Sequence, residues 1–291
     1  MRIGIMGASG NLGKKTLDAV LHRGIAPADI VALVRHPDKL KEYVKYGIGI
    51  RWADYDDPSS LMESFQDIER ILLIPTTASP ADRVRQYYNA ISAARNTGTD
   101  HLLHYSLVAA SLESPFLITP FLLYAESALR TSGLNWTILR NSFYADPIAQ
   151  WVPDILRMGT IPYPTGEGRC SYVSRDDIAR AGAAALTTEG HENKIYKLTG
   201  PEALTTADLC RAVEEVTGHI VKDNGSTDLE YIQVCKQEKI PEDVIRLLLT
   251  MYHTIRNGFL DVVSDDVERL TGRPAERFED YLRRSYNKSS R

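Results

Sequence analysis

A glycine-spaced turn near the N-terminus carries the clearest chemical signal in the chain. It reads GASGNLG over residues 7–13, follows an apolar segment expected to be a strand, and precedes an expected helix. In such a turn the first glycine permits the tight bend, the second lets the backbone approach a diphosphate, and the third lets the helix pack closely on the strand. The N–H groups at the helix N-terminus also favour an anion there. We therefore predict that a dinucleotide is held by Gly7, Ser9, Gly10, Asn11, Leu12 and Gly13.

The end of the next expected strand bears on which dinucleotide is bound. An acidic residue at this place binds free ribose hydroxyls, whereas a basic residue accommodates a 2′-phosphate. The chain has Arg35 there, followed by His36 and Lys39, and it has no Asp or Glu between residues 30 and 37. This cluster favours NADP(H) over NAD(H), with Arg35 reading the phosphate. The alternative is that these are solvated charges of an exposed loop.

Two further strand ends are expected to border the cofactor, because ligands of open α/β sheets sit at the carboxyl ends of the strands. Asp54 follows the third expected strand and is a candidate hydrogen-bonding partner for adenine. Pro75, Thr76 and Thr77 follow the fourth and are expected to line the site.

The elements that must position these residues alternate between strand and helix patterns. The expected strands cover residues 2–7, 30–35, 49–53, 70–74, 101–106 and 136–140. The expected helices between them cover residues 12–22, 37–46, 59–66, 80–97 and 120–131. This alternation predicts a Rossmann-type, doubly wound α/β fold with a parallel sheet and helices on both faces.

The rhythm changes at Phe143, after which four prolines crowd into residues 147–164. A helix is expected again at 176–187 and a strand at 194–198, which could rejoin the sheet, and further helices are expected from Thr206 onward. We therefore predict two parts. Residues 1–142, joined by parts of 174–200, form the NAD(P)-binding Rossmann domain, whereas 143–173 and 201–291 form a smaller C-terminal α/β lobe for substrate or partner. The polar residues 287–291 are expected to fray.

Composition excludes several classes of partner. Hydrophobic residues make up 43% of the chain, the formal net charge is −4, and no apolar run is long enough to span a bilayer. A membrane or a nucleic acid is therefore not expected as a partner, whereas a homodimer stays open. The start of the chain shows no export leader, and Cys170, Cys210 and Cys235 lack CxxC spacing, so we expect free thiols and a cytoplasmic location. No metal is expected, because His101 and His104 point to opposite faces of one strand.

Several motifs in this order resemble a known family. They are GASGNLG at 7–13, LVRHPDK at 33–39, ADYDD at 53–57, SL at 106–107, TILRNSFY at 137–144 and VSRDDIA at 173–179. Together they resemble the NmrA-like atypical short-chain dehydrogenases/reductases, most closely the type-2 NAD(P)H:quinone oxidoreductase branch, up to about Gly218. The resemblance implies a substrate cleft between the Rossmann domain and a small lobe, over the nicotinamide. Members include quinone and azo-compound reductases, sugar-nucleotide epimerase-like proteins, and sensors that bind the cofactor without turnover.

The chain departs from the wider superfamily at a helix that bears on mechanism. Many members carry Tyr-x-x-x-Lys there, in which the cation lowers the pKa of the tyrosine for proton transfer. Here Ala128 stands where the lysine would follow Tyr124, and a register shifted by one places Leu123 and Ser127 at the two positions instead. The missing lysine disfavours alcohol chemistry and sugar epimerisation, which need a strong proton relay.

Quinone reduction depends less on such a relay, because the cofactor supplies the hydride and the site mainly orients the acceptor. We predict hydrogen bonds to the acceptor from Ser106, Tyr124 and Asn141, although Tyr124 could instead have no catalytic role. We predict stacking on the acceptor by Phe143, Tyr144 and Trp151, although the first two could instead only pack the lobe against the sheet.

The favoured function is an NADPH-dependent reductase that passes hydride to a quinone-like or other planar electrophilic small molecule. The alternative is a non-catalytic NADP(H)-binding redox sensor of the NmrA type that acts on a protein partner. A nucleoside-diphosphate-sugar epimerase-like protein is the third reading.

Overall fold

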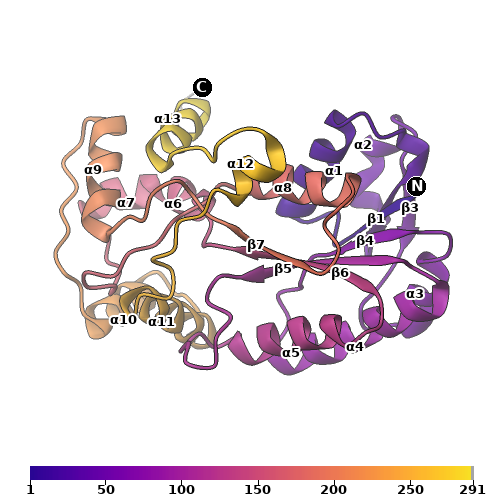
Figure 1. Cartoon of the computed structure of the whole chain (residues 1–291). Coiled ribbons are helices and arrows are strands. Elements are labelled where there is room, and N and C mark those ends of the chain that lie inside the picture. Colours follow the sequence, from indigo (N-terminus) through magenta and orange to yellow (C-terminus); the bar gives the residue numbers. More distant parts are fainter. Residues whose placement is uncertain (290–291) are drawn as a thin grey trace.

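A seven-stranded parallel sheet forms the centre of the computed structural model, which describes residues 1–289 (Figure 1). The strands are β1 (Ile3–Met6), β2 (Ile30–Val34), β3 (Gly49–Trp52), β4 (Arg70–Leu73), β5 (His101–Leu107), β6 (Asn135–Asn141) and β7 (Lys194–Leu198). They lie in the order β3-β2-β1-β4-β5-β6-β7, so the direction of winding reverses between β1 and β4. In sheets of this kind the reversal opens a crevice at the carboxyl ends of the strands.

Helices cover both faces of the sheet. On one face lie α1 (Asn11–His22), α8 (Arg175–Thr187) and α12 (Asp266–Thr271), and on the other lie α3 (Pro58–Ser64), α4 (Pro80–Thr97) and α5 (Thr119–Arg130) (Figure 1). Every residue of β1, β2 and β4 is buried, as expected for central parallel strands covered on both sides. The predicted Rossmann-type fold is therefore confirmed.

Local signals explain where several helices start and stop. Asp57 caps α3 by accepting the N–H groups of Ser59 and Ser60, and Pro58 takes the first helical position. Ser79 caps α4 in the same way, and Gly98 ends that helix in the left-handed conformation. These helices therefore begin and end close to where the sequence placed them.

One expected helix is wrong in type. Residues 37–46 form a 3-10 helix, Pro37–Leu40, followed by the short helix α2 (Lys41–Val44). The backbone of Leu40 leaves the helical range at φ −124°, and its side chain is fully buried. Anchoring Leu40 in the core therefore breaks the continuous helix that the pattern suggested.

The C-terminal lobe has an apolar core of its own. It consists of α6 (Asp146–Gln150), α7 (Val152–Met158), α9 (Thr206–Thr217), α10 (Asp228–Gln237), α11 (Glu242–Arg256) and α13 (Phe278–Ser289). Its β structure within the described residues consists of isolated bridges, such as Tyr144 to Val173 and Cys170 to Leu204. Helix α12 packs against α8 and β7 instead, with Val267 in the core beside the sheet. The division into two parts stays a proposal, with α12 on the Rossmann side.

Helix α13 continues through residues 287–289, so the expected fraying is wrong for these residues, whereas residues 290–291 lie outside the described part of the chain. Within residues 1–289, no helix has both the length and the apolar character needed to cross a membrane.

Candidate functional site

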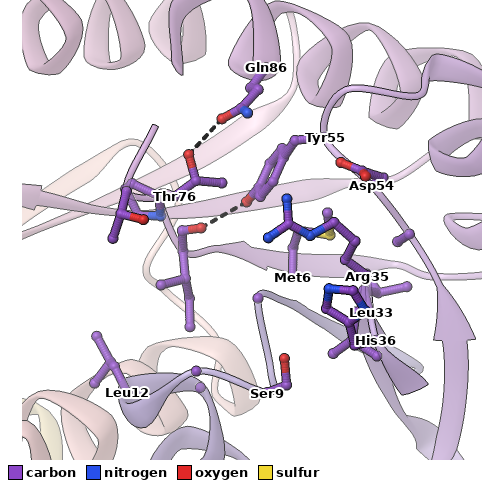
Figure 2. A pocket seen from close by; sticks show the side chains of 18 of the residues that line it. Met6, Ser9, Leu12, Leu33, Arg35, His36, Asp54, Tyr55, Thr76 and Gln86 are labelled. Carbon is purple, nitrogen blue, oxygen red and sulfur yellow. Dashed lines mark hydrogen bonds between the residues drawn. The ribbon is translucent and has the colours of Figure 1, made fainter. Parts of the chain in front are cut away.

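A cleft of about 540 Å³ opens at the carboxyl ends of β1, β2, β3 and β4 (Figure 2). Its lining includes every residue that the sequence predicted for the cofactor: Gly7, Ser9, Gly10, Asn11, Leu12, Gly13, Arg35, Asp54, Pro75, Thr76 and Thr77. These residues come from four separate loops. The parallel register of the strands therefore brings the predicted cofactor residues together.

The glycine turn has the backbone geometry that an anion site needs. Gly7 adopts φ +82° and donates its N–H to the carbonyl of Leu33 at 3.0 Å, and Gly10 donates to the carbonyl of Gly7 at 3.1 Å. Gly10 is the N-cap of α1 without a side-chain capping bond, and no acidic residue stands in the first turn. The N–H groups in the first turn of α1 are therefore left for a ligand, and they fit a dinucleotide diphosphate.

Three basic side chains line the cleft next to the end of β2. Arg35, His36 and Lys39 are all exposed, and within residues 1–289 none of their side chains has a hydrogen-bond or ion-pair partner. In Figure 2 the Arg35 side chain reaches into the pocket beside Tyr55, with His36 next to it. Unpaired basic side chains at this place fit the 2′-phosphate of NADP(H).

A network of hydrogen bonds fixes the opposite rim of the cleft. Thr76 donates its hydroxyl to Gln86 Oε1 at 2.7 Å, and the Gln86 amide donates to Asp56 Oδ2 at 3.1 Å. Tyr55 donates to the carbonyl of Ile74 at 3.0 Å, and burial raises the pKa of its hydroxyl (Figure 2). Asp54 accepts the N–H of Asp56 at 3.0 Å. These bonds hold the loops after β3 and β4 in place before a ligand arrives.

Arg175 also lines the cleft, and sequence reasoning missed its role. Its guanidinium lies 4.5 Å from the centre of the Tyr144 ring and 3.4 Å from Asp146 Oδ1. Asp146 also accepts the backbone N–H of Arg175 at 2.9 Å. The helix dipole disfavours a cation in the first turn of a helix, and Arg175 is the first residue of α8. The buried carboxylate of Asp146 and the ring of Tyr144 hold the Arg175 guanidinium in place there. The signal that could have singled out Arg175 in the sequence is a basic residue at the N-terminus of a predicted helix.

None of the six residues predicted to meet the acceptor is among those lining the cofactor cleft, but one of them, Tyr144, contacts Arg175, which does line it. Tyr144 lies against the Arg175 guanidinium, and Asn141 forms a side-chain hydrogen bond with Tyr144. Burial raises the pKa of the Tyr144 hydroxyl, and both Arg175 and the bond from Asn141 act against this rise. Asn141 Oδ1 is buried without a partner among the described residues, so it is free to accept a hydrogen bond.

The two other predicted aromatic residues lie elsewhere. Phe143 packs in the lobe core with its ring at 73° to that of Phe116, the ring centres being 5.7 Å apart. Trp151 lines a second cavity inside the lobe. Neither residue is among those lining the cofactor cleft.

Ser106 and Tyr124 are also absent from the lining of the cofactor cleft. Ser106 is buried and donates its hydroxyl to Glu126 Oε1 at 2.7 Å. Tyr124 packs on the apolar core beneath α3, α4 and α5, and burial raises the pKa of its hydroxyl. The structure therefore does not gather Ser106, Tyr124 and Asn141 into one catalytic group, because the first two side chains face the helices on one side of the sheet.

Glu126, which the sequence gave no reason to single out, organises a buried polar cluster around Ser106. Its side chain is 4% exposed, and its carboxylate accepts bonds from Arg140 Nη2 at 2.6 Å and Arg130 Nη2 at 2.9 Å. Removing one partner from a buried, hydrogen-bonded ion pair is strongly destabilising. We expect Glu126→Gln to lower the free energy of unfolding by about 3 kcal/mol, measured by urea denaturation. The control Ser106→Ala should cost about 1 kcal/mol, and an equal cost for both would contradict a charge-centred cluster.

The two histidines of β5 take part in separate contacts. His101 Nε2 lies 2.8 Å from Thr137 Oγ1, whereas His104 Nδ1 lies 2.8 Å from the Tyr87 hydroxyl. Burial lowers the pKa of His104 to about 4. In the described part of the chain, no group of three or more His, Cys, Asp or Glu side chains could hold a metal ion.

Comparison with known families agrees with the geometry of the cleft. A family model described as NAD(P)H-binding matches residues 7–189, which include the glycine turn, Arg35 and Arg175. The chain belongs to this family. Membership confirms the nicotinamide dinucleotide that the sequence predicted.

Individual relatives match over nearly the whole chain. Quinone oxidoreductase 2 of Escherichia coli (strain K12) is 29% identical over 272 residues, which is 94% of each protein. The NAD(P)H azoreductase of Xenophilus azovorans is 26% identical over 279 residues, which is 96% of each. The solved structure of the NADPH-dependent quinone oxidoreductase from Escherichia coli, complexed with NADPH, covers 98% of this chain and 100% of that one at 28% identity, with a TM-score of 0.93. The resemblance to the NmrA-like quinone oxidoreductase branch, the NADP(H) cofactor and the oxidoreductase class are thereby confirmed.

Proposed function

We propose that this family member is an NADPH-dependent reductase that transfers hydride to a quinone-like or other planar electrophilic acceptor. The observation that carries the proposal is the cleft itself, in which uncapped N–H groups of α1 lie across from the unpaired Arg35. Relatives named as quinone and azo-compound reductases support this class of acceptor.

Different residues of the cleft bind different parts of the cofactor. The first turn of α1 holds the diphosphate, and Arg35 with His36 and Lys39 holds the 2′-phosphate. When bound, NADPH supplies the hydride. The rim formed by Thr76 and Gln86 limits the movement of the cofactor, since their side chains are already hydrogen-bonded to each other.

We assign the acceptor end of the site to Tyr144, Arg175 and Asn141. Negative charge develops on the acceptor oxygen as it is reduced, and the Arg175 guanidinium opposes that charge. The Tyr144 hydroxyl can donate a hydrogen bond to the same oxygen, with Arg175 as the neighbouring cation that Tyr-x-x-x-Lys members supply from a lysine. The free oxygen of Asn141 suits a donor, such as the carboxamide of the nicotinamide or the hydroxyl of the reduced acceptor.

Purified protein is expected to oxidise NADPH faster when a small quinone, such as menadione, is added, as followed by absorbance at the nicotinamide band. Tyr144→Phe should lower kcat about tenfold and leave NADPH affinity unchanged, because it removes one donor to the developing charge. Tyr88→Phe is the matched control on the exposed face of α4. Absence of quinone-dependent NADPH oxidation across a panel of quinones and azo dyes would reject the proposal.

A redox sensor is the second candidate, favoured by the missing lysine and by the position of Tyr124 outside the cleft. A sensor must bind NADP+ and NADPH with different affinities, and calorimetry measures both. Equal affinities, together with no protein captured in either state, would remove this candidate.

We keep a cytoplasmic location as a proposal, supported by Cys170, Cys210 and Cys235 being buried and unpaired. Light scattering would measure whether the chain forms a homodimer.

A further inference from the structure

A second cavity, of about 500 Å³, lies inside the C-terminal lobe. We call it the lobe pocket. It is bounded by the end of α6, the segment before Thr165, and helices α10 and α11. Its volume falls within the range of small-molecule sites. The residues that matter most to its chemistry are Trp151, Tyr163, Tyr231, Val234, Leu248 and Tyr252.

Aromatic rings give the lobe pocket flat, rigid walls. The ring of Trp151 is nearly parallel to that of Tyr163, at an interplanar angle of 7° with the centres 5.8 Å apart. Tyr163 stacks in turn on Tyr252 with the centres 4.6 Å apart, and Tyr231 meets Tyr252 edge-on at 5.0 Å. Tyr163, Tyr231 and Tyr252 are buried, whereas Trp151 is half-buried, so Trp151 is the ring of this stack with surface left for another flat group.

The walls of the lobe pocket carry almost no charge. Glu238 is the charged residue of its lining, and its carboxylate is 2.7 Å from Arg157 Nη2 in an exposed ion pair. Burial raises the pKa of Tyr163 and of Tyr252, so their hydroxyls stay protonated at neutral pH. A charged ligand would lose its hydration here without gaining a partner.

The lobe pocket is separate from the cofactor cleft. The two cavities share no lining residue among the described residues. Helix α6 lies between them: Asp146 at its start binds Arg175 of the cofactor cleft, whereas Gln150 at its end and the following Trp151 line the lobe pocket. A ring bound at Trp151 would therefore lie outside the group formed by Tyr144 and Arg175.

We propose that the lobe pocket binds an uncharged planar aromatic compound of two or three fused rings, at a site separate from the one where hydride is transferred. Stacking on Trp151 and contact with Val234 and Leu248 hold the compound, and the lack of a free charge selects against ions. This proposal goes beyond the reductase activity and does not depend on it.

The test uses the whole chain, calorimetry, and two probes of the same ring system, 2-naphthol and the anion 2-naphthalenesulfonate. We expect 2-naphthol to bind, the sulfonate to bind at least tenfold more weakly, and saturating NADP+ to leave 2-naphthol binding unchanged. Val234→Trp should weaken binding at least tenfold, because the larger side chain occupies part of the cavity, and Trp151→Leu should weaken it about tenfold. Val244→Trp, on an exposed position of α11, is the matched control and should bind as the unchanged chain does.

Four results would overturn the proposal: no binding of 2-naphthol, equal binding of the sulfonate, displacement of 2-naphthol by NADP+, or unaltered binding by Trp151→Leu. Trp151→Leu only shortens a half-buried side chain. If the Val234→Trp protein does not fold, the binding measured for Trp151→Leu still tests the proposal. If the chain reduces quinones, competitive inhibition by 2-naphthol against the quinone would also contradict a separate site. Because calorimetry needs no turnover, failure of the reductase assay leaves this test intact.

Discussion

Replacing Arg35 with alanine is expected to weaken NADPH binding by about 10- to 100-fold and to leave NADH binding nearly unchanged. A hydrogen bond to a charged group contributes about 1.5 to 3 kcal/mol, and each 1.4 kcal/mol corresponds to a factor of ten in affinity. Arg35 has no partner within residues 1–289 that would have to be given up on binding. Its loss therefore removes an interaction with the 2′-phosphate and disturbs little else.

The measurement is a pair of calorimetric titrations, with NADPH and with NADH, for the unchanged chain and for Arg35→Ala. The informative quantity is the ratio of the two affinities, because it cancels any general damage to the cleft. Arg246→Ala, at an exposed position of α11, is the matched control for loss of one positive charge. The NADPH preference should also shrink at high salt, since exposed charges are screened. An equal loss for both dinucleotides would show that Arg35 does not read the phosphate.

The cofactor cleft was predictable from the sequence because its signals are local. The glycine turn, Arg35 and Asp54 each follow closely on a strand, and parallel strands place their carboxyl ends at one edge of the sheet. Knowing where the strands end was therefore enough to know that these loops meet. An error of one residue at a strand end did not change which side chains lined the cleft.

The proposed acceptor end was less predictable because it depends on contacts between distant segments. Tyr144 contacts Arg175 because an isolated β-bridge pairs Tyr144 with Val173. No local sequence pattern predicts that bridge. Ser106 was assigned to the site from its place at a strand end, but its side chain faces Glu126 on α5. Which face a strand residue points to follows from alternation only after the register of the sheet is known.

The aromatic residues at the start of the lobe show another limit of prediction from the sequence. Phe143, Tyr144 and Trp151 are close in sequence and were expected to share one role, yet Phe143 contacts Phe116, Tyr144 contacts Arg175, and Trp151 lines the lobe pocket. The bend between β6 and α6 separates them. Composition identified an aromatic segment, whereas tertiary packing decided what each ring contacts.

Gly13→Ala is expected to lower the free energy of unfolding by about 3 kcal/mol, because the position has no room for a side chain. A Cβ built on Gly13 would lie 2.3 Å from the carbonyl oxygen of Gly7 and 2.7 Å from Cα of Ala8. Both neighbours are backbone atoms of the same turn, so relief requires shifting α1 away from β1. The thermal midpoint without cofactor should fall by about 5 to 10 °C for a chain of this size.

Gly10→Ala is the matched comparison, since it adds the same methyl group three residues earlier. A Cβ on Gly10 would meet only the Gly7 carbonyl, at 3.4 Å, and the backbone there has φ −75°, which alanine adopts without strain. Its cost to stability should stay near 1 kcal/mol, which reflects the poorer N-cap. Its cost to NADPH affinity should be larger, because the methyl group stands where the diphosphate approaches the backbone. The two variants thus separate the packing role of one glycine from the binding role of the other. A Gly13→Ala protein that melts at the unchanged temperature would show that the turn can open, and the close packing of α1 on β1 would then not be what requires glycine.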